Sequence, residues 1–473
     1  MHVGVDIGTG SLKAAHESRD GDHEIVIHRK AYPHGMKSCS VHGSTIFRGY
    51  VEELFSLIAQ VSRESGDPIE GIALDGHGPS LLLLDGEGEP VSDILTWQDD
   101  RASVLADEIR SSWNGSVKSE LGFETKALWL CRNYGHIAHT EGAVILSPKD
   151  YVNYMLTGER MTDSASASTV LFYDPRRGSE AMRRIGLPEH ILPRVVDPWS
   201  SFGSTGTSFS RAAGLRDGIP VYAGGIDAWC EALGAGAVNV GDVGEGTGTS
   251  TCRSLCGDGS CGMNSHVVPD RDMDIVTLSY TGGSLSWAYT LLSEKPEHLE
   301  ESALSEPSSI LFLPYLAGER SPIWDPDASG AFIGLRKEMD KEDLLKGVYQ
   351  GIGFAIRQNM ELLLDNKGVE NTAVRAVGGA NTSDAWLKQK AAITGKVYQK
   401  MSILDTAPFG AWLLAAYGAG AGEIEELTKI FNRVEVDFEP PLQANRRIEE
   451  LFQLYTKTYE MLNPLMHSLS ATW

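Results

Sequence analysis

The chain carries the same short pattern near the start of each half, an apolar strand that runs into a Gly-Thr-Gly turn. The pattern reads VGVDIGTGS at residues 3–11 and VGEGTGTS at residues 243–250, with Gly244 at the position that matches Asp6. Repetition at matching places favours an internal duplication, in which each half folds as a domain of its own. Backbone N–H groups in such turns can bind phosphate oxygens, and the Thr and Ser hydroxyls are further donors.

The length of the chain and its pattern of elements favour two α/β domains. With 473 residues, the chain is too long for one hydrophobic core. Short apolar strands such as Val3–Ile7 and Ile69–Asp75 alternate with segments of helical period, among them the long segment Leu344–Leu364, and this alternation indicates the α/β class. Glycines cluster between the two halves. We place the boundary there, with an N-terminal domain at 1–240 and a C-terminal domain at 241–473.

The composition disfavours several classes of partner. Asp and Glu outnumber Lys and Arg by 64 to 41, and this negative charge disfavours binding to nucleic acid and to anionic membranes. No apolar run reaches the length of a transmembrane helix, and the first residues resemble a strand rather than a signal peptide. Six cysteines fit a reducing compartment. We therefore expect a cytoplasmic protein.

A second glycine cluster introduces a candidate catalytic residue. In VYAGGIDAWCEALGAGAV (221–238), an apolar strand enters Gly224 and Gly225, and Asp227 then begins a helical segment. Glycines let the backbone turn sharply and approach a ligand closely, because they have no Cβ. A carboxylate at a helix N-terminus stays ionised unless it is buried, as a general base for an alcohol requires. The alternative is that Asp227 only caps a packed helix.

Several further motifs follow one another over nearly the whole chain. They are DIGTGSLK (6–13), WQDDR (97–101), SPKDYVNYMLTGE (147–159), TDSASAS (162–168), GGID (224–227), GTGTS (246–250), YLAGERSPIWDPDASGAFIGL (315–335) and GGANTSDAW (378–386). Together these motifs resemble the FGGY family of carbohydrate kinases, which contains glycerol kinase, xylulokinase and gluconokinase. The PKDY and Gly-Glu-Arg-Ser-Pro stretches and His77 most resemble the xylulokinase-like branch. Homodimers are common in this family, so the resemblance also implies a homodimer.

The resemblance implies two actin-like (ribonuclease-H-like) domains around a central cleft that holds ATP, Mg²⁺ and a sugar or polyol. It makes Asp227 the general base that deprotonates the attacking hydroxyl, and Asp6 the second acid, close to the Mg²⁺ ion and the phosphates. The other nucleotide-binding positions belong to two phosphate turns, the start of a helix and an adenosine motif. They are Thr9, Gly10, Ser11 and Lys13; Gly246, Thr247 and Gly248; Gly282 and Ser286; and Gly379 and Ser383.

On the acceptor side, the resemblance implies a group of sugar-binding residues around one turn. They are Gly76, His77, Trp97, Asp99 and Arg101, in addition to Asp227. Two departures bear on the substrate: Ala228 stands where xylulokinases usually have an Asn that helps to hold the sugar, and ALDGH (73–77) replaces the Arg-Glu pair of glycerol kinases. D-xylulose or a related ketopentose or pentitol is therefore the leading acceptor. Gluconate or a tetritol is the alternative within the family.

Two other classes of protein share part of the pattern. An actin- or Hsp70-type ATPase has the same fold and both phosphate turns but no small-molecule acceptor. The TDSASAS segment and the pairing of Asp227 with His77 argue against it. A Rossmann dehydrogenase needs G-x-G-x-x-G directly after a strand, and the N-terminal turn does not fit. A catalytically inactive sugar sensor is a further possibility. The retention of both acids, Asp6 and Asp227, argues against it.

One group of cysteines competes with these interpretations. Cys252, Cys256, Cys261 and His266 have the spacing C-x3-C-x4-C-x4-H, and thiolate and imidazole are ligands that zinc prefers. The pattern is compatible with a zinc site in the second half. We favour the alternative that the resemblance implies, because the FGGY family has an ordinary pair of strands joined by a turn in this region.

Overall fold

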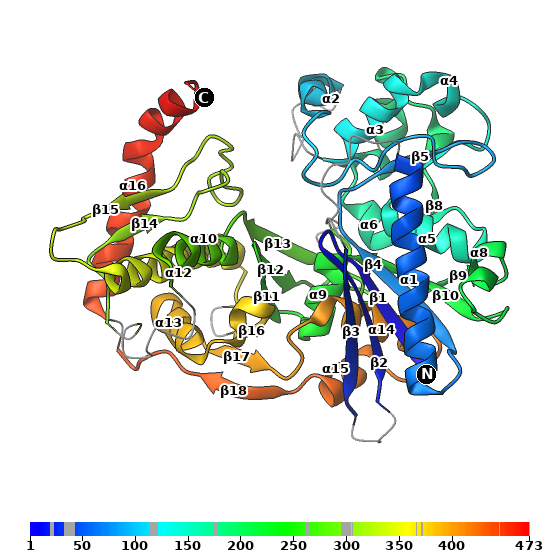
Figure 1. Cartoon of the computed structure of the whole chain (residues 1–473). Coiled ribbons are helices and arrows are strands. Elements are labelled where there is room, and N and C mark those ends of the chain that lie inside the picture. Colours follow the sequence, from blue (N-terminus) through cyan, green and yellow to red (C-terminus); the bar gives the residue numbers. More distant parts are fainter. Residues whose placement is uncertain are drawn as a thin grey trace. The chain divides into compact units, whose positions relative to one another are not determined.

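The protein was analysed as a computed structural model (Figure 1). It divides into two compact units, the first made of Met1–Gly234, Asp258–Asp272 and Ala407–Phe431, and the second of Ala235–Gly257, Met273–Thr406 and Asn432–Trp473. Two segments beyond residue 240 thus belong to the first unit, which differs from the single boundary predicted at 240–241. The residues that the structure describes are 1–18, 23–32, 43–112, 122–174, 177–260, 264–294, 304, 306–365, 367–369, 372–443 and 445–472.

The first unit is built on a six-stranded sheet with the order β3-β2-β1-β4-β10-β9. Its first three strands form an antiparallel meander, β4 and β10 run parallel to β1, and β9 is an antiparallel edge strand. In sheet order, the strands are β3 (Ile25–Ala31), β2 (Ser11–Glu17), β1 (His2–Ile7), β4 (Gly71–Gly76), β10 (Pro220–Ile226) and β9 (Ser201–Ser204).

Helices cover both faces of this sheet, which explains why its central strands are apolar throughout. Val3 and Val5 of β1 share a core with helices α1 (Gly43–Ser65) and α5 (Pro148–Thr157). Gly4 faces the other way, against α14 (Thr406–Gly418), where a Cβ would lie 2.1 Å from the Trp412 nitrogen. Glycine at this position therefore lets α14 pack directly on the strand.

The second unit repeats the arrangement with a sheet of the order β13-β12-β11-β16-β17-β18. Again three strands form an antiparallel meander, two parallel strands follow, and the edge strand is antiparallel. In sheet order, the strands are β13 (Met273–Leu278), β12 (Thr251–Cys256), β11 (Val243–Thr247), β16 (Val374–Val377), β17 (Tyr398–Met401) and β18 (Val434–Phe438). The duplication that the two turns predicted is thus a repeat of the whole sheet.

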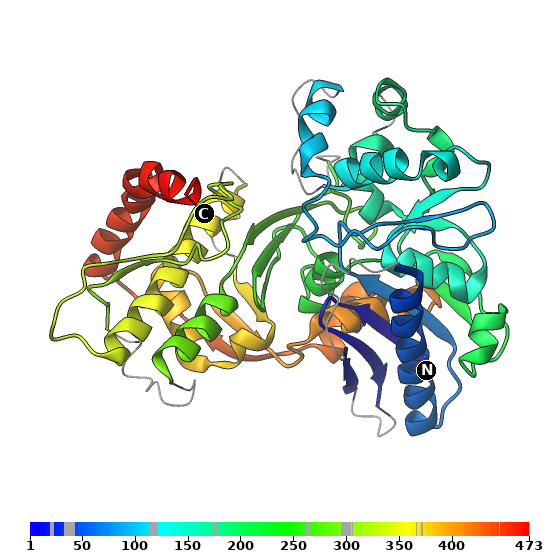
Figure 2. The same cartoon turned by 45° about the horizontal axis from the view of Figure 1, so that its top comes forward.

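Helix α12 (Lys341–Leu364) runs through the core of the second unit and contacts α10 (Gly282–Leu292) and α13 (Asp384–Thr394) (Figures 1 and 2). It begins at a capping box in which the Asp340 side chain accepts from the backbone of Asp343 and the Asp343 side chain accepts from that of Asp340. This cap starts the helix earlier than its apolar period predicted. No described helix is long and apolar enough to cross a membrane.

Shorter elements complete the two units. In the first unit they are β5 (Leu82–Leu84), β6 (Val144–Leu146), β7 (Met161–Asp163), β8 (Arg194–Val196), α2 (Ala106–Ser112), α3 (Phe123–Asn133), α4 (Gly135–Ala138), α6 (Ser164–Ser168), α7 (Gly178–Arg184), α8 (Ser208–Ala212) and α15 (Ile424–Phe431). Helix α9 (Asp227–Ala235) ends one residue beyond the first segment of that unit. The second unit adds β14 (Leu311–Leu313), β15 (Ala331–Ile333) and α16 (Arg446–Ser470).

Candidate active site

Three carboxylates gather in the first unit where β1, β4 and β10 end. Asp6 on β1 is the register partner of Asp75 on β4, and Asp227 begins α9 directly after β10. On the other side of Asp6, its register partner is Lys13, whose Nζ lies 3.1 Å from Asp6 Oδ2. Register partners project from the same face of a sheet, and adjacent strands are about 4.8 Å apart. The structure thus brings together the predicted Asp6, Lys13 and Asp227, and it adds Asp75.

The pKa values of the two acids next to Asp6 are raised above their ordinary range. Asp227 is half-buried, and its Oδ1 accepts the Ala228 N–H at 2.7 Å. Desolvation and then repulsion from Asp6 raise the pKa of Asp227 to about 7, against the opposing effects of Ala228 and Lys13. Burial, followed by repulsion from Asp6 and Asp227, raises the pKa of Asp75 well above its usual range. Partial burial of Asp227 is why its pKa exceeds what a helix N-terminus alone predicts.

The acids offer ligands of the kind that Mg²⁺ prefers. Carboxylate oxygens are hard donors, and Mg²⁺ is usually bound by one or two carboxylates together with substrate phosphates. Asp75 is wholly buried, and no hydrogen-bond donor of the described residues reaches either of its oxygens. The neighbouring Asp6 carboxylate can bond to it only when one of the two carries a proton. The residues present therefore fit a cation close to Asp6, as the prediction for this acid requires.

The first phosphate turn follows β1. Gly8, Thr9 and Gly10 lie between β1 and β2, and Ser11 is the first residue of β2. Thr9 is half-buried, while Gly10 is exposed and has open space where a Cβ would stand. The turn therefore presents backbone groups at the surface of its unit, next to Lys13.

A bulge in β10 sets the position of Asp227. The register between β10 and β4 shifts between Tyr222 and Gly225, and Gly224 in between has φ 73°. A Cβ on Gly224 would lie 1.7 Å from the Leu74 carbonyl oxygen. Only glycine fits this combination of left-handed backbone and close approach. The GGID motif is therefore a strand bulge that leads into the start of α9.

Helix α5 supports the bulge with two buried side chains. Lys149 Nζ and Asn153 Nδ2 each donate to the Ala223 carbonyl oxygen at 3.1 Å. Lys149 Nζ also lies 2.9 Å from Asp163 Oδ2 and 2.5 Å from Asp150 Oδ1, and all three charged side chains are buried. Burial lowers the pKa of Lys149, but the two carboxylates outweigh it and hold the pKa above its usual range. The PKDY and TDSASAS motifs thus meet at β10, the strand that leads to Asp227.

Two of the predicted sugar-side residues, His77 and Trp97, are bonded to Ser80. His77 Nδ1 lies 2.6 Å from Ser80 Oγ, which also accepts the Trp97 backbone N–H at 2.9 Å. The His77 ring is 2% exposed, and burial lowers its pKa to about 4, so the imidazole is neutral near pH 7. Gly76 packs against α5, where a Cβ would lie 3.1 Å from Lys149 Cβ. In this geometry His77 supports the segment that carries Trp97, and its direct bond to a sugar stays a prediction.

Asp99 and Arg101 form a polar pair beside this segment. Asp99 Oδ1 accepts from Arg101 Nε at 2.8 Å, and the Arg101 guanidinium lies 5.5 Å from the centre of the Trp129 ring. Asp99 is buried, and its Oδ2 has no hydrogen-bond partner among the described residues. Burial lowers the pKa of the nearby Lys126 to about 8, against the attraction of Asp99. Charged donors and acceptors of this kind suit the hydroxyl groups of a polyol.

In the second unit, three glycine-bearing segments converge on one turn. Residues 248–250 join β11 to β12, and a carbonyl of this turn accepts two backbone N–H bonds from the start of α10. A Cβ on Gly282 would lie 2.1 Å from the Gly248 carbonyl oxygen, and one on Gly378 would lie 2.5 Å from that of Thr247. The predicted nucleotide positions at Gly248 and Gly282, and Gly379 directly after Gly378, therefore come together although the sequence separates them widely.

The predicted phosphate turn 246–248 is shifted along the chain. Gly246 and Thr247 lie within β11 and are buried, because the strand stays paired with β12 as far as Thr247 and Thr251. The Thr247 hydroxyl donates to Glu245 Oε1 at 3.3 Å and accepts from Thr251 Oγ1 at 3.2 Å. Their side chains are thus part of the sheet, and the exposed turn is 248–250.

The remaining predicted nucleotide residues lie on helices. Ser286 is exposed on α10, and its Oγ donates to the Gly282 carbonyl oxygen at 3.1 Å. Ser383 caps α13, with its Oγ accepting the Trp386 N–H at 3.3 Å. Gly379 is exposed at the start of the short 3-10 helix Gly379–Thr382. Ser383 therefore has a helix-capping role that accounts for it without a ligand.

A buried charge network that the sequence did not reveal is centred on Glu245 of β11, the strand that leads into the turn at 248–250. Glu245 Oε2 accepts from Arg253 Nε at 2.9 Å and from Tyr398 at 3.1 Å, and Glu245 Oε1 lies 2.5 Å from Lys390 Nζ. All four side chains are completely buried. Burial raises the pKa of Glu245, but Arg253 and Lys390 outweigh it and bring the pKa to about 2. The carboxylate therefore stays ionised at neutral pH.

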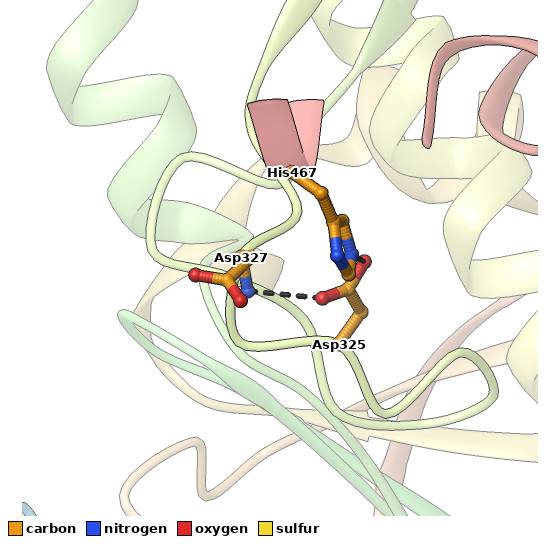
Figure 3. A group of neighbouring side chains, drawn as sticks. All are labelled: Asp325, Asp327 and His467. Carbon is orange, nitrogen blue, oxygen red and sulfur yellow. Dashed lines mark hydrogen bonds and ion pairs between the residues drawn. The ribbon is translucent and has the colours of Figure 1, made fainter. Parts of the chain in front are cut away.

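A third cluster joins a loop to the C-terminal helix α16 (Figure 3). The ligand atoms of Asp325, Asp327 and His467 lie within 4.8 Å of one another, a spacing at which they can hold a metal ion. Asp325 Oδ2, however, already accepts from His467 Nε2 at 2.9 Å, from Tyr459 at 2.6 Å and from Asn463 at 3.0 Å. Because three donors already share this oxygen, we interpret the cluster as an anchor for α16.

The zinc site predicted at Cys252, Cys256, Cys261 and His266 does not fit the strand. Cys252 and Cys256 both lie on the fully paired strand β12, so their Cα atoms are about 13 Å apart at the rise of a strand. Two thiolates on one zinc ion are only about 4 Å apart. One ion cannot bind both sulfurs. Cys261 lies outside the described residues.

Family models match both halves of the chain. Residues 1–234 match the N-terminal domain of the FGGY family of carbohydrate kinases, and residues 273–419 match its C-terminal domain. The chain therefore belongs to the FGGY family and is a carbohydrate kinase. The family resemblance inferred from the motifs is confirmed, and the ATPase and dehydrogenase alternatives fall away.

Individual relatives cover the chain from end to end. The xylulose kinase of Staphylococcus epidermidis is 26% identical over 491 aligned residues, which cover 99% of this chain and 97% of the relative. A solved structure of ligand-bound xylulose kinase from Lactobacillus acidophilus has a TM-score of 0.86 at 20% identity, and the match covers 99% of each chain. A gluconate kinase structure from the same species has a TM-score of 0.84 at 20% identity, with 98% of each chain covered. These matches confirm the predicted actin-like (ribonuclease-H-like) fold.

Proposed function

We propose that this carbohydrate kinase transfers the γ-phosphoryl group of ATP to a hydroxyl of a ketopentose such as D-xylulose, with Asp227 as the general base. The observation that carries the proposal is the position of Asp227, at the glycine-bearing end of β10 beside Asp6 and Lys13. A base is most effective when its pKa lies near the operating pH. The pKa of about 7 for Asp227 meets that condition.

The other charged groups around Asp227 suit phosphoryl transfer. This reaction depends mainly on positioning and on neutralising charge, with little covalent chemistry for the protein to perform. In this proposal Lys13 and the backbone N–H groups of the turn at residues 8–10 bind phosphate oxygens, and so does the turn at 248–250 in the second unit, where the Gly248 N–H already donates to the Ser250 carbonyl oxygen. Asp6 would hold Mg²⁺, which supplies further positive charge to the phosphates when it is bound.

The choice of a ketopentose rests on the relatives. The xylulose kinase of Staphylococcus epidermidis covers nearly the whole chain, and the PKDY motif that resembles this branch holds the strand of the proposed base. Because a gluconate kinase has the same fold at similar coverage, a hexonate is the second candidate acceptor. Asp99 and Arg101 are the polar side chains that we expect to bind the acceptor's hydroxyls.

The test is ADP release with MgATP across a panel of ketopentoses, pentitols, tetritols, hexonates and glycerol. Asp227→Asn is expected to reduce acceptor-dependent turnover by about 10²–10⁴-fold, the usual effect of losing a positioned base. Asp217→Asn is the matched control, because Asp217 is an exposed acid of the same unit that pairs with Arg211. Turnover by Asp227→Asn at the level of the control would exclude Asp227 as the base. Preference for a hexonate over every ketopentose would replace the proposed substrate.

A further inference from the structure

The bulge before Asp227 leaves a buried carbonyl that depends on two side chains from α5. Ala223 is 0% exposed, and its oxygen accepts from Lys149 Nζ and Asn153 Nδ2, each at 3.1 Å. Buried backbone carbonyls in folded proteins are nearly always paired, because an unpaired one costs about as much as a lost hydrogen bond. The two donors are four residues apart on one helix and so lie on the same face. Lys149 and Asn153 thus connect the bulge to helix α5.

The glycines between this carbonyl and Asp227 cannot hold the backbone by themselves. Gly224 and Gly225 separate Ala223 from Ile226 and Asp227, and glycine populates several backbone conformations with similar ease. What fixes the path of β10 at this point must therefore come from neighbouring groups. The bonds from α5 to Ala223 are such restraints, and they act four residues before the proposed base.

Asn153 contributes less to stability than its burial suggests. Its side chain is 0% exposed, and its Oδ1 has no hydrogen-bond partner among the described residues. A buried acceptor without a partner is destabilising by about 1–3 kcal/mol, so an apolar side chain of similar size would pack here at least as well. The N–H group that Asn153 gives to Ala223 is what distinguishes it from such a side chain.

From these contacts we infer that Asn153 is a positioning residue for catalysis: together with Lys149, it fixes the β10 bulge and thereby the reach of Asp227. The inference rests on the proposed role of Asp227 as the base. A displacement of about 1 Å at a reacting group can reduce the rate by about 10²-fold. Loss of one of the two restraints is therefore expected to appear in kcat rather than in the binding of ATP.

The test compares Asn153→Leu with a matched control in the same buried network. Asn153→Leu keeps the volume and removes the donor. Thr162→Val is the control, because it removes the bond of 2.8 Å from Thr162 Oγ1 to Asp150 Oδ2 without touching the bulge. That oxygen also lies 2.8 Å from Ser147 Oγ, so Asp150 keeps a partner. Should Asn153→Leu not fold, Asn153→Ala serves in its place.

Two measurements are made on each variant. With the acceptor on which the wild type is most active, Asn153→Leu is expected to lower kcat by about 10–10²-fold while KM for ATP stays unchanged, and Thr162→Val is expected to retain the wild-type kcat. Hydrogen exchange is expected to be faster at the amides of residues 224–228 in Asn153→Leu and unchanged there in Thr162→Val.

The outcomes separate this inference from the proposed function. Equal kcat and equal exchange in the two variants would overturn the positioning role. A rise in KM for ATP with kcat unchanged would do the same, because it would mean that Asn153 affects binding alone. If no acceptor supports turnover, the proposed function fails, while the exchange experiment still decides whether Asn153 holds the bulge.

Discussion

The Glu245 network yields a stability prediction whose size follows from the structure. The pKa of Glu245 falls from an ordinary 4.5 to about 2 in the folded protein, and each unit of pKa corresponds to 1.36 kcal/mol. The ionised carboxylate therefore contributes about 3 kcal/mol of stability at pH 7. Glu245→Gln removes the charge and leaves Arg253 and Lys390 buried without it. Removing one partner from a buried ion pair typically costs 3–5 kcal/mol, which agrees with the first figure.

Differential scanning calorimetry measures this effect, because it can separate the transitions of two units that need not unfold together. At about 2–4 °C per kcal/mol for a unit of this size, the transition of the second unit should fall by about 6–12 °C in Glu245→Gln. Glu435→Gln is the control, since Glu435 is exposed on β18 of the same unit. The reasoning would be refuted if the free energy of unfolding of the second unit in Glu245→Gln lay within about 0.5 kcal/mol of that in the control, the usual range for surface changes.

The same network makes a prediction about pH. Because the pKa of Glu245 is lower in the folded state than in the unfolded chain, its contribution is complete above about pH 4.5 and is lost as the pH falls towards 2. Near pH 3 the wild-type protein should therefore bind about one proton more when it unfolds than Glu245→Gln does, because Glu245 is ionised in the folded state and protonated in the unfolded chain. Equal pH dependence of the two transition temperatures would show that the carboxylate is not held ionised.

Two further substitutions test the buried groups of the first unit. Lys149→Met should lower its stability by about 3–5 kcal/mol, because two buried carboxylates lose their cation. Calorimetry against Lys337→Met, a change at a side chain 92% exposed, checks this, and equal transitions would contradict it. Asp75→Asn should instead raise the stability by about 1–3 kcal/mol at a pH where Asp75 would be ionised, since the new amide can donate to Asp6 and replaces a buried carboxylate that no described donor reaches. A decrease of that size would show that the acid itself is needed for folding.

Short sequence motifs led to the residues next to turns. The glycine pair before Asp227 pointed to this acid directly, whereas Asp6 and Lys13 were assigned through the family resemblance of DIGTGSLK, and the structure brings all three together. Asp75 follows the apolar run Ile72–Leu74 just before a glycine, so locally it is only the end of a strand. Its place beside Asp6 depends on the register between β1 and β4. An acid at the end of an apolar strand was the signal that could have pointed to it.

Contacts between distant segments lay beyond the reach of the motifs. Lys149 and Ala223 are 74 residues apart, and nothing in PKDY alone indicates which carbonyl its lysine binds. Helix α12 shows the same limit on a smaller scale. Its apolar period predicted a start at Leu344, whereas the capping box at Asp340 begins the helix at Lys341, outside the apolar pattern. Periodicity identifies the face that a helix buries, but polar bonds decide where the helix begins.

Strand pairing also changes how the two halves correspond, and this explains a difference in their chemistry. The last pairs of each hairpin are Asp6 with Lys13 and Ile7 with Leu12 in the first unit, and Gly246 with Cys252 and Thr247 with Thr251 in the second. Gly246, rather than Gly244, therefore matches Asp6. A carboxylate and an ammonium in one hairpin thus stand where the other has a glycine and a thiol. Since neither Gly246 nor a thiol carries charge near neutral pH, we expect the second hairpin to bind phosphate through backbone N–H groups and hydroxyls of its turn, without a charged side chain at these two positions, while the base chemistry belongs to the first unit.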